Sequence, residues 1–117
     1  MYVATLLTPR SGSVYDISET LPHETDDTAV IWRPSWDAAK IWGQVSVDVM
    51  SLDDSCGALL DVGDVDYLDF SQCERLLPWL RQRLASAIGV ELRELYEVMS
   101  SACKRAIELG TGVVIEL

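Results

Sequence analysis

The sequence predicts a single α+β domain, in which a small, mostly antiparallel or mixed sheet is covered on one face by two C-terminal helices. Three observations support this class. Residues 71–110 repeat apolar side chains at helical spacing, residues 111–117 end in a β-branched run, and residues 1–70 alternate β-rich segments with polar turns. Because the chain has 117 residues, the typical size of one domain, we expect these regions to fold together.

The first 70 residues are predicted to be mostly strand and loop. Val45, Val47 and Val49 alternate with polar residues, as in a half-buried strand. A short helix is expected at 35–43, with Ser35 as its cap and Gly43 as its stop. Strands are predicted at 2–8, 28–33, 44–50 and 67–70, and turns or loops at 9–13, 18–27 and 53–57.

Two amphipathic helices are predicted next. In the first, Ser71 and Glu74 form a candidate capping box, Pro78 predicts a kink or a restart, and Gly89 is the expected stop. The second helix is expected to end at Gly110. The last segment, 113–117, is then a buried strand at the edge or in the centre of the sheet.

The cysteines and the apolar segments bear on location. Three cysteines cannot all pair, and Cys73 and Cys103 fall within apolar helical patterns, where a thiol acts as a core residue. We therefore expect a reducing, cytoplasmic location and a core role for Cys73 rather than a nucleophilic one. No apolar stretch approaches the roughly 20 residues of a membrane helix, and no signal peptide is expected.

Charge is the most informative feature of this sequence. The net charge is −10, and residues 1–74 hold 14 acidic residues against 3 basic ones, whereas residues 75–117 hold 5 against 6. Such asymmetry indicates a localised negative field. It argues against direct contact with nucleic-acid phosphates or anionic lipid, since both bind through Lys and Arg. A basic protein is the expected partner.

The motifs for catalysis or metal binding are weak. The carboxylates between Asp61 and Asp69 are as dense as in a calcium loop, but the sixth-position Gly is absent and Gln72 replaces the twelfth-position Glu, so a solvated acidic loop is preferred. The segment with His23, Glu24, Asp26 and Asp27 is interpreted as a polar surface loop. No phosphate loop, CxxC or Ser/His/Asp motif is present, so we expect no enzyme activity, cofactor or metal.

Four tryptophans are many for so short a chain, and tryptophan is enriched at binding interfaces. Trp32 and Trp42 are expected to face the core, whereas Trp36 and Trp79 are candidates for exposure. The predicted partner-binding residues are the acidic side chains, with Trp36 as an aromatic anchor: Asp48, Asp53, Asp54, Asp61, Asp64, Asp66, Asp69 and Trp36.

The end of the chain carries a resemblance to a known family. A small acidic chain in which a helix runs into Ala106-Ile-Glu-Leu-Gly110, followed by the strand Gly112-Val-Val-Ile-Glu-Leu117, resembles the immunity proteins of bacterial toxin systems, including contact-dependent inhibition. The resemblance covers the pattern of about the last 45 residues and transfers no functional residue. It implies neutralisation of a basic, nuclease-type toxin whose active site is covered by the acidic surface. Charge reversal at Asp64 and Asp66 together is then expected to slow association and weaken its salt dependence.

Two alternatives remain open. The acidic surface could mimic DNA and block a nucleic-acid-binding effector. The chain could instead be a small enzyme or ligand-binding domain, with a pocket built around Trp32, Trp42 and Tyr15. The sequence indicates no oligomeric state.

Overall fold

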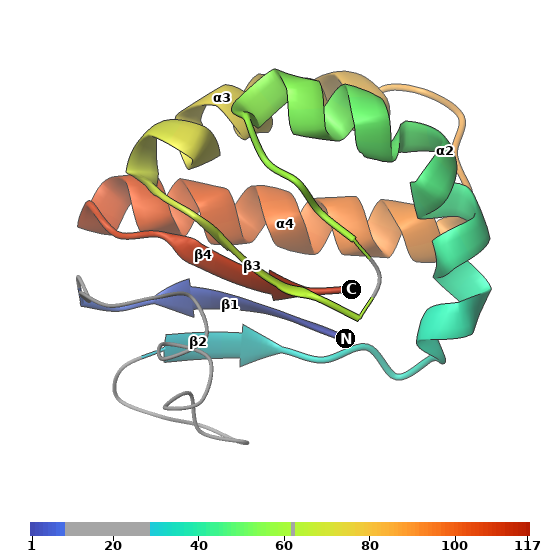
Figure 1. Cartoon of the computed structure of the whole chain (residues 1–117), viewed down its shortest axis with the longest axis horizontal. Coiled ribbons are helices and arrows are strands. Elements are labelled where there is room, and N and C mark those ends of the chain that lie inside the picture. The colour runs from blue at the N-terminus through green and yellow to red at the C-terminus, as the bar shows by residue number, and fades with distance from the viewer. Residues whose placement is uncertain (9–28, 62) are drawn as a thin grey trace.

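The computed structural model describes residues 1–8, 29–61 and 63–117 (Figure 1). This part of the chain contains three helices and a four-stranded antiparallel sheet, which confirms the α+β class. The elements in chain order are β1 (Tyr2–Leu6), β2 (Ala29–Trp32), α2 (Ala38–Cys56), β3 (Val65–Leu68), α3 (Phe70–Leu84), α4 (Val90–Leu109) and β4 (Val113–Glu116).

The last strand lies in the centre of the sheet. The strand order is β2-β1-β4-β3, and all three pairings are antiparallel. Val3 lies opposite both Trp32 of β2 and Ile115 of β4. The first and last strands therefore pair directly, whereas β2 and β3 lie at the two edges of the described sheet.

Strand alternation divides the sheet into two apolar faces. Val3, Leu68 and Ile115 belong to the main core beneath the helices, whereas Ala4 and Val114 belong to a second buried cluster on the opposite face. The three helices cover one face (Figure 1). Helix α4 packs against β1 and β4, and α3 packs against α4 and α2. The expectation that the C-terminal helices cover one face is confirmed, with α2 as an additional helix.

Helix α2 differs more from the sequence-based prediction than any other described element. The predicted strand 44–50 and loop 53–57 are wrong, because one helix runs from Ala38 to Cys56. The helix predicted at 35–43 is confirmed from Ala38 onward, but Ser35 is not its cap and Gly43 is not its stop. It begins after Asp37, whose carboxylate accepts the Ala39 amide, and ends at Gly57 in the left-handed conformation (φ 69°). Its buried residues follow helical spacing: Ile41, Val45, Leu52 and Cys56.

The start of α3 also differs from the prediction. Its capping box is formed by Asp69 and Gln72, not by Ser71 and Glu74, because β3 ends at Leu68 instead of extending to residue 70. The helix continues through Pro78 without a restart. Pro78 lies on the exposed side of α3, where water can bind the carbonyl that loses its amide partner.

The ends of the C-terminal helices are partly as predicted. Helix α3 ends with Ala85 as its C-cap, so Gly89 is not its stop; Gly89 is instead the N-cap of α4. Helix α4 ends at Gly110 (φ 68°), as predicted. Cys56, Cys73 and Cys103 are free and buried, which confirms the core position of Cys73. No helix in the described part of the chain has the length and hydropathy needed to cross a membrane.

Candidate functional site

Most of the predicted partner-binding aspartates lie along one edge of the molecule. Helix α2 carries two of them in its last turn, the following connection carries two more, and β3 at the edge of the sheet carries another. We call this set the acidic patch: Asp53, Asp54, Asp61, Asp64 and Asp66. The patch arises because the chain leaves α2 and enters the edge strand β3 through a short acidic connection.

The carboxylates of the acidic patch are close enough to affect one another. Partial burial raises the pKa of Asp66, the charges of three other patch residues raise it further, and an Asp61 backbone hydrogen bond opposes the shift. Burial also raises the pKa of Asp53, although its carboxylate accepts the Leu60 amide at 3.1 Å. The fold thus holds like charges together against their mutual repulsion.

Four of the five patch carboxylates lack an ion pair within the described part of the chain. Within residues 1–8, 29–61 and 63–117, no Lys or Arg forms an ion pair with Asp53, Asp54, Asp64 or Asp66. The guanidinium of Arg75 lies beside Gly57 at the end of α2. A Cβ added to Gly57 would lie 3.6 Å from Arg75 Nη1. No group of three or more His, Cys, Asp or Glu residues in the same ranges is arranged to hold a metal ion. The patch is suited to accept hydrogen bonds from guanidinium or ammonium groups.

Asp69 lies next to this patch but caps a helix. Its Oδ1 accepts the Gln72 amide at 2.8 Å, and the Gln72 side-chain amide donates to the Gly57 carbonyl at 3.2 Å. These bonds attach the start of α3 to the end of α2. Asp69 is exposed, so its second carboxylate oxygen can still face a partner.

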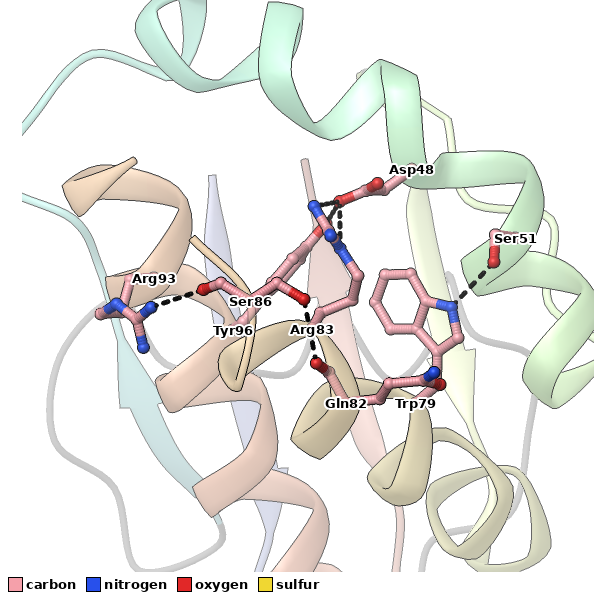
Figure 2. Close-up of polar contacts among 8 residues, drawn as sticks. All are labelled: Asp48, Ser51, Trp79, Gln82, Arg83, Ser86, Arg93 and Tyr96. Atoms are coloured by element: carbon pink, nitrogen blue, oxygen red, sulfur yellow. Dashed lines mark hydrogen bonds and ion pairs between the residues drawn. The ribbon is translucent and has the colours of Figure 1, made fainter. Parts of the chain in front are cut away.

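Asp48 lies earlier in α2 than the patch residues, and its carboxylate bonds to side chains of other helices. Its Oδ2 accepts hydrogen bonds from the Tyr96 hydroxyl at 2.7 Å and from Arg83 Nε at 3.1 Å, and Arg83 Nη2 lies 3.1 Å away (Figure 2). Tyr96 is fully buried, and burial together with the Asp48 carboxylate holds the pKa of its hydroxyl far above the ordinary value. Asp48 therefore joins α2 to both α3 and α4.

Trp36 and Trp79 are half-buried rather than freely exposed. Trp79 donates to the Ser51 hydroxyl at 2.9 Å and packs edge-on against Tyr96, with centroids 5.5 Å apart (Figure 2). Trp36 precedes α2, whereas Asp54 lies in its last turn, so at 1.5 Å per residue they are separated by about 25 Å of helix. Trp36 instead contacts Trp32 edge-on, and its indole N–H donates to Glu94 Oε2 at 2.8 Å.

A second candidate site, not identified from the sequence, is a groove between β2 and α4. Its volume is about 560 Å³, within the usual range for ligand pockets. We call it the β2–α4 groove; its lining residues are Val3, Thr5, Val30, Trp32, Glu94, Glu97, Val98, Ser101, Ala102 and Arg105. One signal was available: Glu94, Val98, Ser101 and Arg105 recur at helical spacing beside the main apolar stripe of α4.

Among the described residues of the predicted aromatic pocket, Trp32 lines this groove. Trp32 and Trp42 both pack against the core while remaining partly exposed, but Trp42 does not line the groove. Tyr15 and the polar segment with His23, Glu24, Asp26 and Asp27 lie outside the described residues.

Comparison with known proteins gives no further guide to the site. No family model, no curated protein sequence and no solved structure matches this chain.

Proposed function

We propose that this chain is an immunity-type inhibitor domain, which binds a basic, nuclease-type toxin domain through the acidic patch and covers its active site. The observation that carries this proposal is the gathering of carboxylates from α2, the following connection and β3, with no ion pair from a described Lys or Arg to Asp53, Asp54, Asp64 or Asp66. Burial raises the pKa of Asp66 and neighbouring carboxylates raise it further; a cationic partner would relieve that part of the shift due to repulsion. Binding of such a partner would therefore also compensate the negative charge of the acidic patch.

The proposed mechanism is electrostatic docking followed by occlusion. A nuclease binds phosphates with Lys and Arg, so its active site has the charge opposite to the acidic patch. The net charge of −10 would steer such a partner before contact. Carboxylates then accept paired hydrogen bonds from arginines, which fixes orientation. In this proposal the domain acts in the cytoplasm, where its three thiols stay reduced.

Leu59 is the proposed apolar anchor, in place of Trp36. Its side chain is 85% exposed, and it lies in the connection between Asp54 and Asp61. A stable interface needs roughly 800 Å² on each partner, and its centre is normally apolar with a polar rim. An exposed leucine in this acidic connection fits such an arrangement.

The proposal is tested by affinity capture with charge-matched variants. The tagged chain is incubated at low salt with a lysate of the organism that encodes it, and bound proteins are eluted with a salt gradient and identified by mass spectrometry. The patch variant is Asp54→Lys/Asp64→Lys. The control is Glu97→Lys/Glu108→Lys, which changes the net charge equally but lies on exposed positions of α4.

We expect one basic protein to be captured by the wild type and the control, and lost from the patch variant. That protein should have nuclease activity, which an equimolar amount of this chain suppresses. Retention by the patch variant would contradict the proposal, and so would loss from the control alone, since the contact surface would then lie on α4. Capture of a basic protein with no suppressible activity would contradict the inhibitor assignment.

A further inference from the structure

The β2–α4 groove is open because α4 does not reach the edge of the sheet. Helix α4 packs mainly against β1 and β4, so Val30 and Trp32 of β2 border a groove beside α4. Val30 of β2 is 58% exposed, and it lies opposite Thr5, whose hydroxyl donates to the Ala102 carbonyl of α4 at 3.2 Å. Small side chains on α4, at Ser101 and Ala102, leave the space between helix and strand unfilled.

The charges of this groove are separated along its length. Glu94 and Glu97 line one end, and Arg105 lines the other, about 12 to 16 Å away at 1.5 Å per helical residue. Arg105 is paired with Glu108 at 3.1 Å. Glu97 is exposed and forms no ion pair with any described residue. The glutamate end is thus the part of the groove that attracts a cation.

Aromatic rings stand beside these glutamates. Trp32 lines the groove and contacts Trp36 edge-on, with centroids 6.1 Å apart and planes at 64°. The Trp36 indole N–H donates to Glu94 Oε2 at 2.8 Å, which fixes this carboxylate next to the ring pair. Indole rings beside carboxylates favour organic ammonium groups, through cation–π attraction and ion pairing.

We propose that the β2–α4 groove binds a small organic amine, whose ammonium group lies at the Trp32, Glu94 and Glu97 end and whose apolar body lies along Val30, Val98 and Ala102. The two glutamates favour a positively charged group, and the apolar side chains of the groove favour an apolar ligand body. This site lies along β2, at the opposite edge of the sheet from β3, and its occupancy is independent of the acidic patch.

The test compares two ligands that share one apolar body and differ in charge. Phenethylamine and 3-phenylpropionate are titrated into the ¹⁵N-labelled protein, and amide and indole signals are followed by NMR. We expect saturable shifts at residues 94–105 and at the Trp32 indole with phenethylamine, and binding of the anion about tenfold weaker. Glu97→Gln should remove most of this discrimination, whereas Asp54→Asn, with the same charge change in the acidic patch, should not.

A second variant tests the groove without altering charge. Ala102→Leu places a larger side chain in the groove and should abolish binding of phenethylamine, while a dispersed spectrum shows that the variant is folded. Equal binding of the amine and the anion would overturn the proposal, as would binding that neither Glu97→Gln nor Ala102→Leu weakens. A lysine tetrapeptide that binds through the same residues more tightly than phenethylamine would show that the groove takes a protein side chain instead of a free amine.

Discussion

The carboxylate of Asp48 joins α2 to α3 and α4 through a single oxygen, Oδ2, which faces both Tyr96 and Arg83. The Asp48 side chain is 14% exposed, so these bonds are formed largely away from water. Removing the Asp48 carboxylate would leave the buried Tyr96 hydroxyl and the partly buried Arg83 guanidinium without their acceptor. The residue is therefore assigned a role in stability instead of partner binding.

Asp48→Ala should lower the free energy of unfolding by about 2–4 kcal/mol, because a buried charged acceptor is lost. Asp54→Ala, which removes an exposed carboxylate from the same helix, should change it by less than about 0.5 kcal/mol. Urea denaturation followed by circular dichroism measures both. Equal effects of the two substitutions would show that the Asp48 contacts contribute nothing specific.

Asp66 makes the free energy of unfolding of the protein depend on pH. Its pKa is raised in the folded state, first by burial and then by neighbouring carboxylates. The folded protein therefore holds this proton to higher pH than the unfolded chain, and the contribution of Asp66 to stability is lost as the pH rises through the raised pKa.

Asp66→Asn should therefore stabilise the protein relative to wild type at pH 7. The difference should shrink as the pH falls through the raised pKa and vanish below about 4, where an unfolded aspartate is also protonated. Urea denaturation at a series of pH values measures this difference. A difference that does not change with pH, or a less stable variant at pH 7, would contradict the described environment of Asp66.

Helix α2 could not be predicted from its local residue pattern. The alternation of Val45, Val47 and Val49 is typical of a strand, yet Val47 is 81% exposed on the outer side of a helix. The helical pattern becomes clear only when the buried positions Ile41, Val45, Leu52 and Cys56 are considered together over 16 residues. Asp53 and Asp54, which suggest a turn, occupy the last helical turn because Gly57 supplies the left-handed cap.

The C-terminal elements could be predicted because several signals agree there. Apolar spacing, the Gly110 stop and the β-branched last segment all indicate the same structure. Pro78 was an exception, since tertiary packing keeps α3 continuous. The strand order could not be predicted, because long-range pairing of β4 between β1 and β3 leaves no local pattern in the sequence.

Gly43 inside α2 and Gly57, its C-cap, should respond oppositely to substitution by alanine. Gly43 lies inside the helix and an added Cβ would meet no atom within 4 Å, so Gly43→Ala should raise the free energy of unfolding by about 0.5–1 kcal/mol. Gly57 has φ +69°, so Gly57→Ala should lower it by about 1–2 kcal/mol. Denaturant unfolding measures both changes. Destabilisation by Gly43→Ala would argue that this segment is not helical.

For the whole molecule, the two candidate sites lie at opposite edges of the sheet. The acidic patch follows β3 and the β2–α4 groove follows β2, with β1 and β4 between them. The negative charge of the patch could be predicted from composition, because aspartates cluster between residues 53 and 66. The contacts of Trp36 with Glu94 and of Asp48 with Tyr96 and Arg83 could not, since they depend on how the helices pack.

Binding of a basic partner by the acidic patch is tested by the rate at which the two proteins associate. Association of the captured partner is followed by stopped-flow fluorescence at increasing ionic strength, for the wild type, Asp54→Lys/Asp64→Lys and Glu97→Lys/Glu108→Lys. Asp54 and Asp64 are used because both are exposed, whereas Asp66 is partly buried.

If the patch is the contact surface, its charge reversal should slow association by about tenfold or more at low salt and flatten the dependence of rate on ionic strength. The charge-matched control on α4 should keep a salt dependence close to that of the wild type, because its substitutions lie away from β3. The same rate and slope for the wild type and the patch variant would contradict the assignment of this surface.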